Sequence, residues 1–530
     1  MNGIPSTPKK PIRSLYAFIQ ARTGSTRFPK KVLAELPPGS GKTILEHIHA
    51  RIRKVLPADK IVYLIPEGDA ELADFLSLKK MRYFVGPLED VRQRYSNAAE
   101  HFEADAILRL TGDNPFYDTL HLELLLQAFS KEECDLSYFK GLPLGTGGEV
   151  FRTSALDSLP ENGWEERHKE HVSLHIKEDP NRFRIVPIPA ILTKKESERI
   201  PYFRLTVDTP EDFQTVSDLL TKKNPEVFSE LGVYDFLRME EENPVLFRKN
   251  LDIPQVRFPL PDPERTPKKG KIAFLVAPAK EYGSGHFARS SILFSLLPFR
   301  NWEPAWLREF PKDGEYEILL IDHRDIEIPF EYKRTKVLLL DHFGKDRKNY
   351  PHWDVLPHPE NESDFDWNRI LLPPALFSSE FRTGQESKKY DLFCYSGSLG
   401  EAETQRLDSF FRTYFSGKKI LRVGGQTPEK DANIEYVSRL SRPEYLNALA
   451  SSRSFLGYFG QSLFEALYLK IPSATFSISP VHESLSKLLE KRGVPVSDLR
   501  SMPEFSLGNG SPGPEGYDLL LEKIEDCLDS

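Results

Sequence analysis

The residues with the clearest chemical potential lie in segment 19–33, IQARTGSTRFPKKVL, directly after the apolar start of a strand, LYAFI. Small residues after a strand let backbone N–H groups approach an anion closely, and here they are Gly24, Ser25 and Thr26. Cations that would neutralise charge on a leaving pyrophosphate flank them: Arg22, Arg27 and Lys31. The pattern predicts a phosphate-binding loop, and a solvated basic loop after an edge strand is the alternative.

Two aspartates lie where strands are expected to end. Asp113 follows the run AILRL (106–110), and Asp208 lies in RLTVDTPEDF (204–213) before a helix that Pro210 begins. The carboxyl ends of strands in an α/β sheet are where ligands bind, and carboxylate oxygens are ligands that Mg²⁺ prefers. The pair therefore predicts a Mg²⁺ site. The alternatives are a turn cap for Asp113 and a helix N-cap for Asp208.

A second candidate site lies in the other half of the chain. The segment YGSGHFAR (282–289) places Gly285 and His286 between an expected strand and an amphipathic helix. A helix N-terminus suits an anion, and an imidazole can accept a proton from water or a hydroxyl. A histidine that only caps the helix is the alternative.

A further strand, turn and helix are expected in YFGQSLFEALYLKIPS (458–473). Gly460 and Ser462 lie in the turn and Glu465 lies one turn into the helix. A helix N-terminus with a nearby carboxylate is a plausible way to bind the phosphates and ribose of a nucleotide.

Short apolar runs alternate with amphipathic segments throughout, which predicts an α/β fold. Proline-rich residues 251–270 predict a linker. We expect a disordered tail, a first α/β domain, this linker, and two Rossmann-like lobes with a closing helix at 517–528. The corresponding ranges are 1–13, 14–250, 251–270, 271–377 and 378–530.

Composition excludes several classes of protein. The 530 residues carry a formal net charge of −8, which argues against a general nucleic-acid binder. The 3 cysteines are far apart and fit a reducing compartment. No run approaches the ~18 apolar residues of a membrane span, and the start lacks the apolar block of a signal peptide. We expect a cytoplasmic protein whose oligomeric state, a homodimer included, is left open.

Seven motifs in order carry a family resemblance over 14–250. They are IQARTGSTRFPKKVL, ILEHIHARI, GPLEDVRQRY, ILRLTGDNP, GGEVF, HKEHVSLHI and RLTVDTPEDF. This half resembles the cytidylyltransferases of spore-coat polysaccharide type, relatives of the CMP-Kdo and CMP-sialic acid synthetases. The resemblance implies a Rossmann-like mixed sheet that transfers CMP from CTP to a sugar hydroxyl and releases pyrophosphate.

The resemblance also implies residue roles. The CTP phosphates would be bound by Arg22, Ser25, Arg27 and Lys31, and Mg²⁺ would be bound by Asp113 and Asp208. The base and ribose side would be lined or supported by Asp90, Arg94, Arg109 and Thr111. The sugar acceptor, for which an acidic sugar is one candidate, would face Glu149, Glu170 and His171. Lys30 departs from the family pattern, which usually has glycine before the lysine, and is expected to add charge beside the phosphates.

The second half resembles the two-lobed GT-B architecture, and more narrowly the UDP-sugar hydrolases of pseudaminic-acid biosynthesis. The resemblance implies that His286 acts as base and that Ser462 and Glu465 belong to a nucleotide-binding turn. Gln461 and the YSGSLG turn (395–400) depart from the pattern. Hydrolysis, sugar transfer and binding alone stay open for this half. The chain is thus expected to be a bifunctional enzyme of surface-glycan or nonulosonic-acid biosynthesis.

Overall fold

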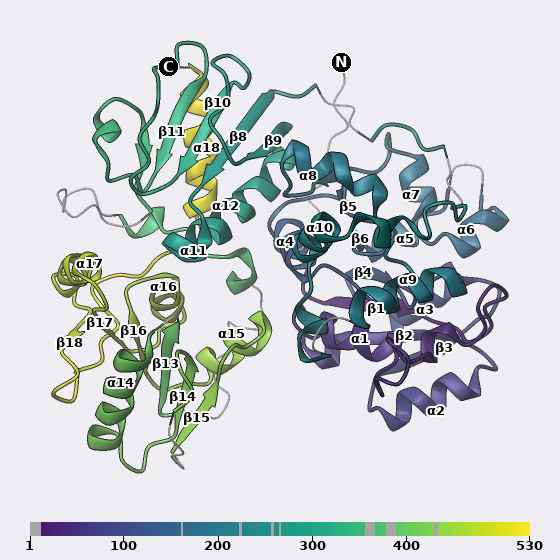
Figure 1. The fold of residues 1–530 in the computed structure, drawn as a ribbon, viewed down its shortest axis with the longest axis horizontal. Coiled ribbons are helices and arrows are strands. Elements are labelled where there is room, and N and C mark those ends of the chain that lie inside the picture. The colour runs from purple at the N-terminus through teal and green to yellow at the C-terminus, as the bar shows by residue number, and fades with distance from the viewer. Residues whose placement is uncertain are drawn as a thin grey trace. The chain divides into compact units, whose positions relative to one another are not determined.

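The computed structural model describes residues 12–160, 163–221, 225–255, 259–263, 267–355, 366–377, 388–397, 399–428 and 433–529. The chain divides into two compact units. The first is Met1–Lys269 with Ser295–Trp306, and the second is Gly270–Phe294 with Leu307–Ser530. The first unit occupies mainly the purple and dark teal part of the chain in Figure 1. Most of the expected N-terminal tail lies outside the described residues.

The first unit is built on a seven-stranded mixed sheet in the order β3-β2-β1-β4-β6-β5-β7. Its strands are β1 Leu15–Gln20, β2 Ile61–Pro66, β3 Tyr83–Gly86, β4 Ala106–Thr111, β5 Leu136–Lys140, β6 Glu149–Arg152 and β7 Ile185–Pro189. Strand β6 runs antiparallel to both β4 and β5, and the other pairings are parallel. The mixed sheet that the family resemblance implied is present.

Helices connect and flank these strands (Figure 1). They are α1 Ile44–Ile52, α2 Ala70–Leu78, α3 Val91–His101, α4 Thr119–Lys131, α5 Thr153–Leu156, α6 Glu166–Glu170, α7 Leu174–Glu178, α8 Lys194–Arg199, α9 Pro210–Thr221 and α10 Val233–Glu242. Local sequence explains where they begin. Thr43 and Glu46 form a capping box at α1, and Asp90 accepts the backbone N–H of Gln93 at α3.

The hydrophobic core of the first unit lies between the sheet and its helices. Every residue of β2 is buried, as its unbroken apolar sequence predicts for a strand covered on both faces. Phe18 of β1 and Tyr95 of α3 pack edge to face in this core, with ring centroids 6.0 Å apart. The core fixes the central strands, whose ends carry the site.

Two further sheets belong mainly to the second unit. The five-stranded sheet has the order β12-β11-β10-β8-β9. Its strands are β8 Gly270–Val276, β9 Trp302–Leu307, β10 Ile318–Asp322, β11 Lys336–Leu340 and β12 His352–Trp353. The six-stranded sheet has the order β15-β14-β13-β16-β17-β18. Its strands are β13 Leu392–Gly397, β14 Ile420–Gly424, β15 Ile434–Val437, β16 Phe455–Tyr458, β17 Ser473–Phe476 and β18 Val496–Ser497, and all of its pairings are parallel.

Seven described helices accompany these two sheets. They are α11 Ala279–Tyr282, α12 Gly285–Leu296, α14 Glu401–Tyr414, α15 Arg442–Ala450, α16 Gln461–Tyr468, α17 Pro480–Glu490 and α18 Gly516–Asp529. Helix α18, yellow in Figure 1, contains the expected closing helix and contacts β11. The last helix thus returns to the five-stranded sheet.

Within the part of the chain that the structure describes, no helix is long and apolar enough to cross a membrane. The linker expected at 251–270 lies partly outside the described residues, and β8 begins at its last position. The domain boundaries drawn from the sequence stay predictions.

Candidate functional site

The site of the first unit lies where β1 and β4 end. These strands pair in parallel, with Gln20 opposite Thr111, so the loops that follow them begin side by side. The chain continues from β1 to β2 and β3 on one side of β1, whereas β4 lies on its other side. In an open α/β sheet such a change of direction leaves a crevice at the strand ends, and ligands bind there.

The loop after β1 is fixed from within and from α2. Thr23 donates its N–H to Asp69 Oδ2 and its hydroxyl to Asp69 Oδ1, both at 2.8 Å. Backbone N–H groups of Ser25 and Lys30 donate to the Thr23 carbonyl, each at 2.9 Å. These bonds curl the loop back on itself, so its small residues and cations face one cavity.

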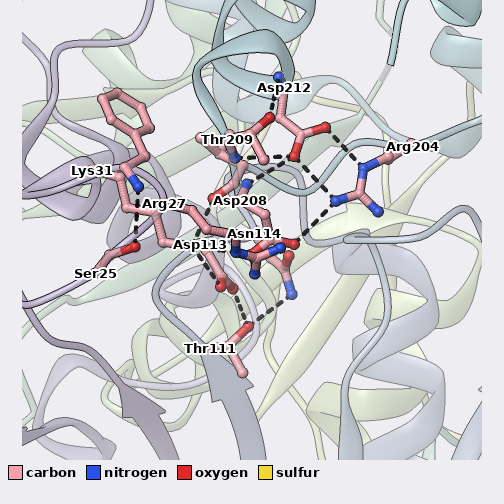
Figure 2. Close-up of polar contacts among 12 residues, drawn as sticks. Ser25, Arg27, Lys31, Thr111, Asp113, Asn114, Arg204, Asp208, Thr209 and Asp212 are labelled. Carbon is pink, nitrogen blue, oxygen red and sulfur yellow. Dashed lines mark hydrogen bonds and ion pairs between the residues drawn. The ribbon is translucent and has the colours of Figure 1, made fainter. Parts of the chain in front are cut away.

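Four charged side chains meet at the centre of the site (Figure 2). Lys31 Nζ lies 3.1 Å from Asp113 Oδ2 and 3.1 Å from Asp208 Oδ1, and it donates to the Val207 carbonyl at 2.8 Å. Arg27 Nη2 lies 3.2 Å from the same oxygen of Asp208. The structure therefore brings together two cations of the loop and both predicted metal ligands.

Asp113 is held by residues next to it in sequence. Thr111 donates its hydroxyl to Asp113 Oδ1 at 2.6 Å, and Asn114 Nδ2 donates to Thr111 Oγ1 at 2.9 Å. Buried Tyr117 donates to the Thr111 carbonyl at 3.1 Å, and burial raises the pKa of its hydroxyl to about 12. With Oδ1 anchored, Oδ2 faces Lys31.

Asp208 is positioned by a buried ion pair. Arg204 Nη2 donates to Asp208 Oδ2 at 3.2 Å, and the same guanidinium contacts both oxygens of Asp212, which is fully buried (Figure 2). Thr209 and Asp212 exchange hydrogen bonds before α9, at 3.2 and 3.3 Å. Thr209 therefore caps this helix, and the carboxylate of Asp208 is left for the site.

A glycine lets the Asp208 segment approach the sheet. Gly145 has a φ of +93°, and a Cβ there would lie 2.5 Å from the Thr206 backbone nitrogen. Leu205 donates its N–H to the Leu144 carbonyl, and Val207 donates to the Asp113 carbonyl, both at 2.8 Å. The segment GLPLGTGGEV (141–150) thus helps to place Asp208.

One cavity collects most of the predicted residues of this unit. Those that line it are Arg22, Ser25, Arg27, Lys31, Arg94, Thr111, Asp113, Glu170 and Asp208. Gln20, Thr26 and Gly112 complete its polar lining. The cavity carries more cations than carboxylates, as an anionic ligand requires.

Four predicted residues are absent from this lining. Asp90 caps α3 through the Gln93 N–H at 2.7 Å. Arg109 donates to Glu149 at 3.0 Å and to Gln20, which does line the cavity, at 3.2 Å. His171 ends α6. The binding roles assigned to Asp90, Arg109, Glu149 and His171 stay predictions.

Glu149 is the most strongly neutralised of these groups. It accepts from Arg109 and from the Ser173 hydroxyl, at 3.0 and 2.5 Å, and forms an ion pair with Lys177. Burial alone would raise the pKa of Glu149, but Lys177 and Arg109 outweigh it and hold that pKa at about 2. Glu149 therefore lies ionised beneath the site.

Lys30 was expected to add charge beside the phosphates, but its side chain pairs with Glu71 instead. Its Nζ lies 2.8 Å from Glu71 on α2, and it is absent from the cavity lining. Its φ is 56°, the left-handed region that glycine adopts at no steric cost. The conformation accounts for a glycine at this position in the family pattern.

The second unit holds a buried network at the ends of β10 and β11. His286 Nδ1 lies 2.6 Å from Asp322 Oδ1, and Ser290 donates to Asp322 Oδ2 at 2.7 Å. Arg289 donates to Asp322 Oδ2 at 2.8 Å and to Asp341 Oδ2 at 2.5 Å. Burial would raise the pKa of Asp322, but Arg289 and His286 lower it well below its usual range.

This network settles the orientation of His286. Arg289 Nη2 also lies 2.9 Å from His286 Nδ1. If Nδ1 carries a proton, it cannot also accept a hydrogen bond from Arg289. Because Asp322 is ionised, Nδ1 carries a proton toward it and the guanidinium serves the two carboxylates. The imidazole is therefore held by Asp322, and Nε2 is the ring nitrogen left for chemistry. Gly285, which begins α12, has open space around its Cα.

In the six-stranded sheet region, Glu465 is already engaged. Its two oxygens accept from the two terminal nitrogens of Arg442 at 3.0 and 3.2 Å, and the side chain is buried. Gly460 precedes α16 and Ser462 lies in its first turn. The three predicted residues thus lie together at the N-terminal end of α16, and Arg442 joins them through its ion pair with Glu465.

Sequence reasoning missed the residues that orient the predicted ones. They are Asn114, Arg204, Asp212, Arg289, Asp322, Asp341 and Arg442. RLTVDTPEDF contained a signal, because Thr209 and Asp212 have the spacing of a capping box. No local signal joined Asp322 to His286, since the two are 36 positions apart.

A mixed sheet with a cation- and carboxylate-lined cavity at its switch point defines a Rossmann-like nucleotide-binding α/β domain. Residues 16–253 match the family model described as cytidylyltransferase. Spore coat polysaccharide biosynthesis protein SpsF of Bacillus subtilis is 35% identical over 212 residues, which cover 39% of this chain and 85% of SpsF. The chain therefore belongs to the cytidylyltransferase family.

Other similar proteins carry related names. The 3-deoxy-manno-octulosonate cytidylyltransferase 2 of Burkholderia ambifaria is 32% identical over 123 residues, 22% of this chain and 43% of that protein. A solved cytidylyltransferase from Leptospira borgpetersenii is 25% identical with a TM-score of 0.40, and the match covers 46% of this chain and 99% of that one. The resemblance predicted for 14–250 is confirmed, and that of the second half to UDP-sugar hydrolases stays a prediction.

Proposed function

We propose that the first unit transfers CMP from CTP to a sugar hydroxyl. The observation that carries the proposal is the convergence of Arg27 and Lys31 with Asp113 and Asp208 in one cavity at the ends of β1 and β4. Ser25 and Thr26 of the small-residue turn line the same cavity. Nucleotidyl transfer depends mainly on positioning and on neutralising phosphate charge, and this arrangement offers both.

In the proposed reaction, the sugar hydroxyl oxygen attacks the α-phosphorus of CTP. The bond from this phosphorus to the oxygen that bridges it to the β-phosphate breaks, and pyrophosphate and the hydroxyl proton are released. Arg22, Arg27 and Lys31 bind the phosphates and balance the charge on the leaving pyrophosphate. Arg94 and Thr111, which line the same cavity, are assigned to the nucleoside side.

One observation supports a magnesium ion bound by Asp113 and Asp208. Asp113 Oδ2 and Asp208 Oδ1 lie at equal distances of 3.1 Å from one cationic atom, Lys31 Nζ, so two hard oxygens already converge on a cation. Among the described residues, no group of three or more His, Cys, Asp or Glu side chains converges to hold a metal. Substrate phosphates and water would complete the shell of Mg²⁺, which lowers the charge of the phosphates.

We assign the sugar acceptor to the Glu170 side of the cavity. The relatives support a sugar, because one is named for spore coat polysaccharide biosynthesis and another for 3-deoxy-manno-octulosonate. Activation of a sugar, acidic sugars included, for surface-glycan synthesis is the role that this supports.

Pyrophosphate release from CTP, measured on the full chain with a panel of neutral and acidic sugars, tests the proposal. Sugar-dependent release is expected, and it should be lost in Asp113→Ala. No release with any sugar, or an unchanged rate in Asp113→Ala, would contradict it.

A second activity is proposed for the second unit because of the bond between His286 and Asp322. A histidine oriented by a buried carboxylate can accept a proton from water that attacks the anomeric carbon of a UDP-sugar. Two further features support a GT-B-like arrangement. The pairings among β8, β10, β11 and β12 are parallel, as are those of the six-stranded sheet, and the last helix, α18, contacts β11 of the five-stranded sheet. Free sugar plus UDP would indicate hydrolysis, a new glycosidic bond would indicate transfer, and binding of UDP without turnover would indicate a binding module.

A further inference from the structure

The position of Lys31 raises a conflict with the proposed metal. Its Nζ lies 3.1 Å from each of the two oxygens that would bind a divalent cation, and its side chain is only 10% exposed. Mg²⁺ binds carboxylate oxygens at about 2.0–2.1 Å, so an ion held by both aspartates would need the space that the ammonium fills. Both cations cannot occupy this position.

The two carboxylates are the fixed partners in this arrangement. Asp113 is held through Thr111, and Asp208 through Arg204, whose own partner Asp212 is fully buried (Figure 2). Lys31 carries its charge on a flexible four-carbon stem that begins next to the phosphate-binding loop. When a dication arrives, the lysine is therefore the group that moves.

Charge counting gives the direction of the exchange. Of the two carboxylates, Arg27 and Arg204 contact Asp208 alone, whereas Lys31 is shared by both. At that shared position a dication supplies a charge of +2, where the ammonium supplies +1. A displaced ammonium would stay in the cavity that Arg22 and Arg27 also line, where a triphosphate supplies new negative charge.

We propose that Lys31 is the resident counter-ion of Asp113 and Asp208 in the metal-free protein, and that a divalent cation displaces it toward the phosphates of the nucleotide. The inference rests on the proposed function, since it takes these aspartates as the metal ligands. Metal binding and phosphate binding then become linked through one side chain, and the linkage is reciprocal.

Mn²⁺ alone, titrated into the nucleotide-free full chain and followed by the electron paramagnetic resonance of free Mn²⁺, tests the exchange. Lys31→Met keeps the length of the side chain and removes the competing charge, so Mn²⁺ should bind at least about ten-fold more tightly than to the wild type. Lys30→Met is the matched control, because Lys30 pairs with Glu71 outside the cavity, and its Mn²⁺ affinity should equal that of the wild type.

A second measurement uses CTP affinity with and without Mn²⁺. In EDTA, Lys31 stays paired with the aspartates, whereas Mn²⁺ frees it to contact the phosphates of CTP. Lys31→Met should therefore weaken CTP binding about ten-fold or more with Mn²⁺, and markedly less in EDTA. An equal loss in both conditions would overturn the exchange.

Asp113→Asn separates failure of the inference from failure of the proposed function. If it leaves Mn²⁺ binding unchanged, Asp113 is not a metal ligand, and both the exchange and the proposed magnesium site are overturned, whereas pyrophosphate release still decides CMP transfer. If it weakens Mn²⁺ binding while Lys31→Met does not tighten it, the metal site stands and the exchange is overturned. Lys31→Gln serves in the same titrations should Lys31→Met fail to show wild-type circular dichroism.

Discussion

Arg204 and Asp212 form a two-point ion pair beneath Asp208, with Nε to Oδ1 at 2.8 Å and Nη2 to Oδ2 at 3.1 Å. The same arginine reaches Asp208 Oδ2 at 3.2 Å, and Asn250 donates to Asp212 Oδ1 at 2.8 Å. The pair therefore joins the capping of α9 to the orientation of a proposed metal ligand.

Asp212→Ala should lower both stability and activity. It leaves the buried Arg204 guanidinium without its main partner, and breaking a buried ion pair in this way costs about 3–5 kcal/mol. Urea denaturation gives the free energy of unfolding, and CTP-dependent pyrophosphate release gives the activity. Thr209→Ala is the control, since it removes a cap worth about 1 kcal/mol and leaves the ion pair intact. Equal effects of the two variants would contradict this assignment.

Lys30→Gly should leave CTP turnover within about two-fold of the wild type. The Lys30 side chain pairs with exposed Glu71, and its backbone adopts a left-handed conformation that costs a non-glycine residue about 1–2 kcal/mol. The free energy of unfolding should therefore stay level or rise by up to about 1 kcal/mol, because glycine also gains entropy in the unfolded chain. A ten-fold or greater loss of turnover would instead place Lys30 at the phosphates.

Glu149 should make the first unit sensitive to acid. Its pKa is about 2 in the folded chain and 4.5 without these partners, so its stabilisation is complete above about pH 4.5 and disappears as the pH falls toward 2. The difference corresponds to about 3 kcal/mol. Urea denaturation of wild type and Glu149→Gln at several pH values should show a gap near neutral pH that narrows on acidification. A gap that does not depend on pH would contradict the role of its charge.

His286→Asn should separate the two proposed activities. The substitution removes the ring nitrogen that accepts a proton, so turnover of UDP-sugars should disappear while CTP-dependent pyrophosphate release stays at the wild-type level. Product analysis by chromatography measures both in the same preparation. UDP-sugar turnover that survives in His286→Asn would exclude this histidine as the base.

Arg442 and Glu465 should act on UDP binding as one unit. Because Glu465 gives both oxygens to Arg442, we expect Glu465→Gln and Arg442→Met each to weaken UDP binding, and the double variant to lose little more than either. Calorimetry with UDP measures the three affinities. Additive losses would indicate that Glu465 contacts the nucleotide independently of Arg442.

Local patterns predicted most of the central strands. Apolar runs such as LYAFI and AILRL fall in β1 and β4. The strands β3 and β6 are harder to predict in this way, because each has only four residues and carries little periodicity. They form because neighbouring strands offer free edges to pair with.

The sequence by itself determined the loop that we propose binds phosphate, the two aspartates at strand ends and the family, because each is a pattern of adjacent residues. Only the tertiary structure decided how they meet. Lys31 contacts Asp113 and Asp208 from 82 and 177 positions away, and Lys30, next to it in sequence, faces Glu71 instead. Such contacts depend on strand order, register and the turn at Gly145. Those features arise from packing over the whole sheet, which no short stretch of sequence encodes.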